Sequence, residues 1–176
     1  SRLYQLSSKP NETNRGDKRH FSRSYRRRLS AEVLMDAVSD VTGVPEVFSA
    51  TWPSARAMET WNFKISSEFM DAFGRPNSSS DPPCERNTKG TVVQSLHLML
   101  AEKLNSKIVH EKGLARRLAD GKETPLKIAE TIYLTALSRF PTEQEEAVVA
   151  VYFEKHKGNR RAAVEDLLWA VFNSAE

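Results

Sequence analysis

The chain has 176 residues and a mass of 19.9 kDa, with 39% hydrophobic and 28% charged residues. This composition excludes a wholly disordered chain, a collagen-like repeat and a disulfide-rich scaffold. No apolar run approaches the roughly 20 residues that a membrane-spanning helix needs. The first nine residues resemble no secretion signal, and the chain begins without an initiator Met. We therefore expect a single domain over residues 1–176, and the missing initiator Met indicates a fragment or a processed product.

Charge is unevenly distributed along the chain, whose formal net charge is +3. Residues 1–28 hold nine basic and two acidic groups, whereas the remaining residues hold 17 basic and 21 acidic groups. Residues 1–28 show no helical or strand periodicity, which predicts an extended basic arm or loop. Such an arm can dock on phosphates, on anionic lipid or on the mildly acidic remainder of the chain. We favour the last of these and expect the run Arg26–Arg28 to pair with carboxylates.

The first predicted helix covers residues 31–42. Ser30 is its expected N-cap, and Gly43 suits the left-handed residue that ends a helix. Its apolar face follows the spacing i, i+3, i+4 and i+7 and consists of Leu34, Ala37, Val38 and Val41. Leu29 is expected to pack against this face as a hydrophobic staple.

Residues 45–65 show no period, so we expect an irregular segment held in place by Trp52, Trp61 and Phe63. Ser66 or Ser67 is the expected N-cap of a short helix that follows. Residues 75–90 are rich in Ser, Pro and Asn, which indicates a loop or hinge. The predicted divisions are thus the arm 1–28, a first helical part 29–74, this loop and a helical bundle 91–176.

The second half is predicted to be helical almost throughout. Thr91 and Gln94 form a capping box, and the apolar stripe after it comprises Val93, Leu96, His97, Leu100, Leu104 and Ile108. Further helices are expected from 114 to 119, after the cap Thr124, after the capping box of Thr142 and Glu145, and after Asn159. Gly158 is expected to end the second-last helix. Five to seven short helices with brief connections predict an all-α fold, an irregular bundle with a basic arm.

The sequence Cys84-Glu85-Arg86 lies in the predicted loop and contains the only cysteine of the chain. An arginine beside a thiol is the type of neighbour that makes a cysteine reactive. The alternative is an inert loop residue, with Glu85 and Arg86 in structural ion pairs. His97 lies on an apolar helical stripe, which is typical of a core or interface group. A metal site would need Cys84, Glu85 and His97 to converge, and their spacing matches no known signature.

Four arginines make a second candidate binding region: Arg23, Arg26, Arg27 and Arg28. With Phe21 and Tyr25 beside them, they have the composition that grips phosphates and stacks on bases. The same arginines can instead pair with carboxylates of the helix that follows. Motifs for nucleotide binding, for zinc hydrolysis and for serine hydrolysis do not occur in the sequence.

Seven strings follow one another in an order that resembles one known family: SRLYQLSSKPNETN, FSRSYRRRLSAEVLMDAVSDVTGVPE, FGRPN, CERN, QSLHLM, IYLTALSRFPTEQE and DLLWAVFNS. Together they look like the planctomycete-type domain of unknown function, family 1553, which closes large exported proteins. The resemblance covers essentially the whole chain. It implies that this domain is a C-terminal one that follows a second uncharacterised domain and often, in addition, a cytochrome-c-like haem domain near the N-terminus. It also implies an exported or periplasmic location.

The resemblance also implies further helical sequence before Ser1 and a few residues after Glu176. Family members often carry a second cysteine two positions before the one that matches Cys84, and Pro82 stands there in this chain. A paired-cysteine role is therefore not expected. The activity of the family is unassigned, so no catalytic residue carries over, and we expect no cofactor in this chain, with haem confined to the parent protein.

Three functions remain open. The first is a non-catalytic helical scaffold or interaction module of a large exported protein. Its partners would be the upstream domains of the same polypeptide, a polysaccharide or a cell-envelope component. The second is a catalytic or redox partner domain with a site near Cys84 and His97. The third is nucleic-acid binding through the basic arm. We favour the first.

Overall fold

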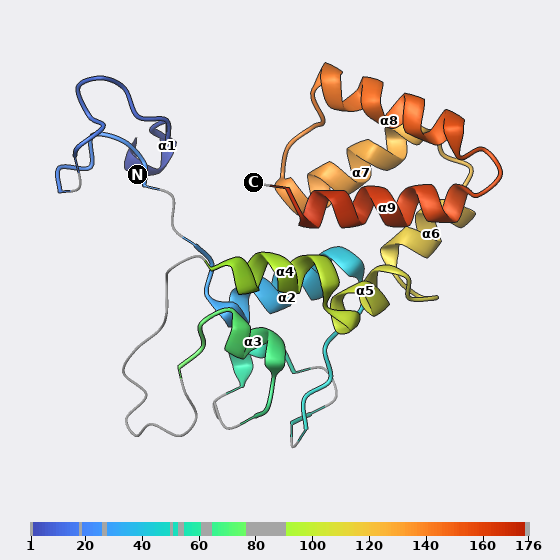
Figure 1. Ribbon diagram of the computed structural model, residues 1–176, viewed down its shortest axis with the longest axis horizontal. Helices are drawn as coiled ribbons and strands as arrows, with labels where there is room; N and C mark the ends of the chain where they lie inside the picture. The colour runs from blue at the N-terminus through green and yellow to red at the C-terminus, as the bar shows by residue number, and fades with distance from the viewer. Residues whose placement is uncertain are drawn as a thin grey trace.

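The computed structural model describes residues 2–17, 19–25, 28–49, 51–52, 55–60, 65–76 and 91–174, apart from the side chains of residues 3 and 4. Within these ranges the chain forms nine α-helices, one 3-10 turn and no strand (Figure 1). The expected all-α fold is therefore confirmed. None of the helices in the described ranges is long and apolar enough to cross a membrane.

The N-terminal segment, residues 2–25, lies apart from the other helices (Figure 1). It begins with one helical turn, α1 (Arg2–Gln5), so the prediction that this region contains no helix is wrong there. The rest consists of turns that are closed by local hydrogen bonds. Asp17 is central to them, because its carboxylate accepts backbone hydrogen bonds from Arg19, His20 and Ser22. The segment is thus folded upon itself rather than extended.

Helix α2 (Ala31–Thr42) has the predicted bounds, with Ser30 before it and Gly43 after it. Gly43 adopts the left-handed conformation, with φ of 70°. The buried face differs partly from the predicted one and consists of Ala31, Met35, Asp36, Val38, Val41 and Thr42. Leu29 is about half exposed. The helix is therefore rotated by part of a turn relative to the predicted stripe.

The segment after α2 is irregular, as predicted, except for a single 3-10 turn, η1 (Ala57–Glu59). Trp52 does not anchor it, since 52% of this residue is exposed. The expected anchors Trp61 and Phe63 lie outside the described residues. The attachment comes instead from the buried Asp36 of α2, whose carboxylate accepts hydrogen bonds from the backbone N–H groups of Ala57 (2.7 Å) and Met58 (3.1 Å). This buried carboxylate ties the segment to α2, and Phe48 of the same segment is also buried in the core.

Helix α3 (Glu68–Ala72) is capped by Ser67, whose hydroxyl accepts a hydrogen bond from the N–H of Met70. Most of the predicted loop 75–90 lies outside the described residues. The single helix that was predicted next is two helices, α4 (Val92–Leu100) and α5 (Glu102–Ile108). They meet at Ala101, which has an extended backbone with ψ of 119°. The chain therefore changes direction within the predicted stripe.

The last four helices match the predicted caps closely: α6 (Leu114–Asp120), α7 (Pro125–Leu137), α8 (Glu143–Lys155) and α9 (Arg160–Phe172). The side chains of Thr124, Thr142 and Asn159 each accept a hydrogen bond from a backbone N–H in the first turn. Helix α8 ends three residues before Gly158, so the predicted end is slightly late.

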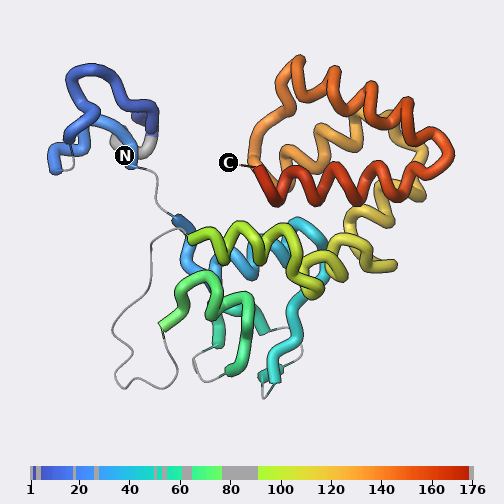
Figure 2. The backbone as a smooth tube through the Cα atoms, in the orientation of Figure 1, coloured from blue at the N-terminus to red at the C-terminus, as the bar shows by residue number. Residues whose placement is uncertain are grey.

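Figure 2 shows α2–α5 gathered in one group and α6–α9 in another, and helix α2 contacts both groups. It contacts α3 and α5 in the first group and α6 and α7 in the second, while α9 contacts α5, α6, α7 and α8. The largest fully buried side chains belong to Met70, Ile128, Ile132, Leu168, Val164 and Thr42. The core thus draws on residues from α2 to α9.

Candidate functional site

Two of the predicted site residues, Arg28 and His97, meet around the ring of Phe73. The guanidinium carbon of Arg28 lies 5.1 Å from the centroid of that ring, a cation–π distance. The imidazole of His97 lies edge-on to the same ring at 6.0 Å and to the ring of Phe69 at 5.7 Å. The two phenylalanine rings are stacked at 4.5 Å. Arg28 and His97 therefore contact the same ring, that of Phe73 at the end of α3.

Gln94 connects this cluster to the start of α4, and only 5% of it is exposed. Its Oε1 accepts hydrogen bonds from Nη1 of Arg28 (2.5 Å) and from the N–H of Thr91 (2.9 Å). Its Nε2 donates to the carbonyl of Ala72 at 3.0 Å. The sequence indicated only the capping role of Gln94, because its contacts with Arg28 and Ala72 span 66 and 22 residues. One amide therefore joins α3, α4 and the chain before α2.

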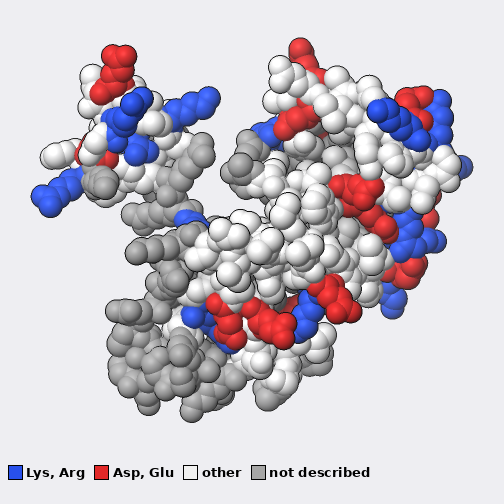
Figure 3. Space-filling view, in the orientation of Figure 1, with Lys and Arg blue, Asp and Glu red and all other residues white. Residues whose placement is uncertain are grey.

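The apolar stripe that was predicted for α4 faces solvent rather than the core. The exposed large apolar residues of this helix are Val92, Val93, Leu96, Met99 and Leu100. Figure 3 shows the corresponding surface as a broad area without charged side chains, with acidic and basic groups along its border. Gln94 is buried instead, and Leu98 packs against the core cluster. We call the five exposed residues the α4 face.

A groove of about 500 Å³ lies beside the α4 face, between α3, α4 and the start of α5. Phe69 and His97 line the groove, together with Leu96 and Leu100 of the α4 face. The carboxylates at its edge belong to Glu68 and Glu102, both exposed, and Lys103 is also exposed there. The lining of the groove is therefore mainly apolar, with two acidic residues and one lysine at its border.

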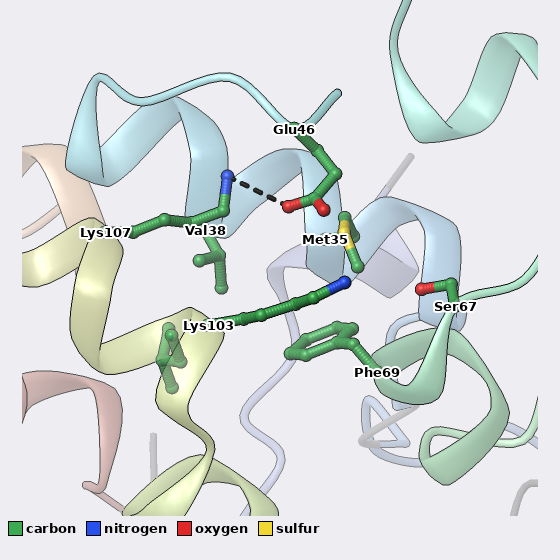
Figure 4. A pocket seen from close by; sticks show the side chains of 8 residues that line it. Met35, Val38, Glu46, Ser67, Phe69, Lys103 and Lys107 are labelled. Carbon is green, nitrogen blue, oxygen red and sulfur yellow. Dashed lines mark ion pairs between the residues drawn. The ribbon is translucent and has the colours of Figure 1, made fainter. Parts of the chain in front are cut away.

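A smaller pocket on the other side of Phe69 contains a lysine that the sequence did not single out (Figure 4). The ammonium of Lys107 lies 3.1 Å from the carboxylate of Glu46 and donates to the carbonyl of Val44 at 2.7 Å. Figure 4 shows Lys103 extending across the pocket toward Met35. The pocket has a volume of about 20 Å³, room for about one water molecule. Lys107 is thus a structural group that ties α5 to the chain after α2.

Arg23, the third candidate that the structure describes, belongs to a different cluster. Its Nη1 donates to the carbonyl of Ser8 at 3.3 Å, and its guanidinium carbon lies 5.0 Å from the centroid of the Tyr25 ring. Both partners lie within the N-terminal segment. Arg23 and Arg28, which were considered together at the sequence level, therefore lie in different places: Arg23 in this segment and Arg28 against the α3–α4 cluster of Phe69, Phe73, Gln94 and His97.

The other candidates, Arg26, Arg27, Cys84, Glu85 and Arg86, lie outside the described residues. The proposed reactive thiol and its neighbours therefore stay predictions. Among the described residues, no group of three or more His, Cys, Asp or Glu side chains is placed so that it can hold a metal ion.

A second apolar groove, of about 400 Å³, lies between α8 and α9. The hydroxyl of Tyr152 donates to the carboxylate of Asp166 at 2.6 Å, and this bond raises the pKa of Tyr152 above its ordinary value. Trp169 is packed against the core cluster but remains partly accessible in the groove. Its Nε1 donates to the carbonyl of Met99 at 3.4 Å. Trp169 therefore lies at the junction of this groove and α4.

Comparison with known proteins gives a family but no activity. No curated protein and no solved structure matches the chain. A match to one family, described as PSD1, a protein of unknown function (DUF1553), covers residues 1–153. It ends in α8, so α9 and the last of the resembling strings lie beyond it. Since the match includes the N-terminal segment, the α3–α4 cluster and the α4 face, this chain belongs to the DUF1553 family.

Proposed function

We propose that this chain is a non-catalytic helical interaction module that binds an amphipathic helix on the α4 face. The observation that supports the proposal is the exposure of five large apolar side chains on a single nine-residue helix. Leaving such residues in water is unfavourable by roughly 25 cal/mol for each Å² of apolar surface. Large exposed apolar patches with a polar border are typical of surfaces that bind a partner.

The shape and charge of the surroundings define the partner. A groove with a mainly apolar lining beside an exposed apolar helix face suits a helix that inserts side chains at the spacing i, i+3, i+4 and i+7. Glu68 and Glu102 place two carboxylates at the border of that groove. Basic residues at the flanks of the partner helix would complement them. The partner is therefore an amphipathic helix with an aliphatic face and Lys or Arg beside it.

We place this helix in the upstream part of the same polypeptide, within a large exported protein. The support is the resemblance of the sequence to modules that close such proteins. An intramolecular partner is present at a high effective concentration, so even a short apolar face is sufficient for stable docking. Export would be tested by locating the parent protein in fractionated cells of its source.

The experiment uses a fluorescein-labelled probe peptide with Leu at i, i+3, i+4 and i+7 and Lys at the remaining positions. Fluorescence anisotropy measures its binding to the 176-residue chain. Leu96→Glu and Leu100→Glu place a charge on the α4 face. Leu126→Glu in α7 is the matched control, because Leu126 is 43% exposed and Leu96 is 48% exposed.

We expect the probe to bind the wild-type chain and the Leu126→Glu variant equally. Each α4 variant should weaken binding by about tenfold, which is roughly 1.4 kcal/mol. A scrambled peptide of the same composition, which has the same charge but no apolar face, should bind at least tenfold more weakly than the probe, by the same conversion. Equal binding by the scrambled peptide, or equal loss in all three variants, would contradict the proposal. Sedimentation that shows a dimer dissociated by Leu96→Glu would instead identify a second copy of the chain as the occupant.

A further inference from the structure

The N-terminal segment contains a cleft of about 420 Å³ that is lined by Ser8, Lys9, Pro10, Arg23 and Tyr25. Its volume falls in the range of roughly 300–1,000 Å³ that is usual for small-molecule sites. Two stretches of chain form its walls and are joined by a backbone hydrogen bond from the N–H of Ser24 to the carbonyl of Ser7. The cleft is therefore built from residues that are distant in sequence but fixed to one another.

The positive charge of the cleft is not neutralised by the part of the chain that the structure describes. Of the five lining residues, Lys9 and Arg23 are cations and none is acidic. No carboxylate among the described residues forms an ion pair with either cation. The carboxylate of Asp17, the acid at the centre of the segment, accepts hydrogen bonds from the backbone N–H groups of Arg19, His20 and Ser22.

Arg23 and Tyr25 are held in position. The guanidinium of Arg23 donates to the carbonyl of Ser8 and lies over the Tyr25 ring, and the Tyr25 hydroxyl donates to the carbonyl of Asp17 at 3.0 Å. The Nε of Arg23 is buried without a hydrogen-bond partner. Buried donors without a partner are uncommon in folded proteins, and some of them mark a place where an ion binds. The side chain thus keeps hydrogen-bonding capacity that the protein does not use.

We propose that this cleft binds a small phosphate monoester, with Lys9 and Arg23 on the phosphate and the rings of Pro10 and Tyr25 against the organic group. A phosphate carries a charge of about −1.5 to −2 and three acceptor oxygens, which suits two cations better than a single carboxylate does. A cleft of about 420 Å³ lined by five residues suits a single phosphate with its organic group better than the continuous backbone of a nucleic acid. This proposed site lies in the N-terminal segment and is separate from the α4 face.

The test is calorimetric titration of the full chain with AMP as the probe, and with adenosine and inorganic phosphate in parallel. Lys9→Gln and Arg23→Gln each remove one positive charge from the cleft. Arg19→Gln is the matched control, since it removes the same charge from an exposed residue of the same segment that does not line the cleft. Lys9→Gln disturbs no side-chain contact of the described residues, so it carries the test even if Arg23→Gln unfolds the segment.

We expect saturable binding of AMP with a Kd of about 1 mM or lower, weaker binding of inorganic phosphate and none of adenosine. Lys9→Gln and Arg23→Gln should each weaken AMP binding about tenfold, and Arg19→Gln by less than about twofold, because only a direct charge-assisted bond is strong. Absence of saturable AMP binding would overturn the proposal, as would equal loss in all three variants. Binding of an oligothymidylate without binding of AMP, falling steeply with salt, would assign the segment to single-stranded nucleic acid instead.

Discussion

The amide of Gln94 offers the sharpest test of how the first helical group is held together. Gln94→Ala removes two hydrogen bonds between neutral groups and one from the charged Arg28. Neutral bonds contribute roughly 0.5–1.5 kcal/mol each and charged ones roughly 1.5–3 kcal/mol. Because Thr91 is exposed, its N–H regains a water partner in the variant. We therefore expect the free energy of unfolding to fall by about 2–4 kcal/mol, below the simple sum of the largest values.

Urea unfolding followed by far-UV circular dichroism measures this loss. Gln144→Ala is the matched control, because Gln144 is also in the first turn of a helix but is exposed. Its effect should stay within about 0.5 kcal/mol. A Gln94→Ala variant as stable as Gln144→Ala would refute the assignment of Gln94 as the link between α3 and α4.

Three further predictions concern the second helical group. Leu168 is fully buried, so Leu168→Ala should lower the free energy of unfolding by roughly 2–5 kcal/mol in urea. The hydrogen bond from Arg139 lowers the pKa of Glu145 from 4.5 to about 2. The resulting stabilisation is complete above pH 4.5 and is lost as the pH falls toward 2, so Glu145→Gln should flatten the stability profile in this window. Asp166→Asn should return the raised pKa of Tyr152 toward 10 in an ultraviolet titration of the phenols.

Each of these predictions has a control. Leu126→Ala should cost less than Leu168→Ala, since Leu126 is exposed in α7, and equal losses would contradict the burial argument. The control Glu143→Gln, in the same first turn, should leave the pH dependence of the free energy of unfolding unchanged. A profile as flat as that of Glu145→Gln would contradict the role of Arg139. Tyr152→Phe identifies which of the four tyrosine titration steps belongs to Tyr152. If that step does not move in Asp166→Asn, the hydrogen bond to Asp166 is not the cause of the raised pKa of Tyr152.

The helices themselves were largely predictable from the sequence, because their ends depend on residues only three or four positions apart. Thr91 with Gln94 and Thr142 with Glu145 form capping boxes as predicted, and Gly43 ends α2. A cap acts within one turn, so tertiary packing does not alter it. The break between α4 and α5 at Ala101 was not predicted, because no glycine, proline or capping residue there interrupts the apolar run.

The candidate site was only partly predictable. The sequence singled out Arg28 and His97 as candidates, but it contained no signal that both lie against Phe73. Buried charges such as Lys107 were also missed. A lysine next to Ile108 is expected to point to water unless a carboxylate such as Glu46, distant in the sequence, comes within reach. These contacts depend on how helices pack, which local patterns do not encode.

By itself, the sequence determined the all-α class, most helix ends and the concentration of positive charge near the N-terminus. Only the tertiary structure decided which face of α4 is buried. Apolar residues surround that helix on most sides, so hydrophobic spacing allows more than one orientation. In the orientation that the structure shows, Gln94 turns inward, and its buried amide is satisfied by Arg28 and Ala72. That rotation leaves Leu96 and Leu100 in solvent and creates the α4 face.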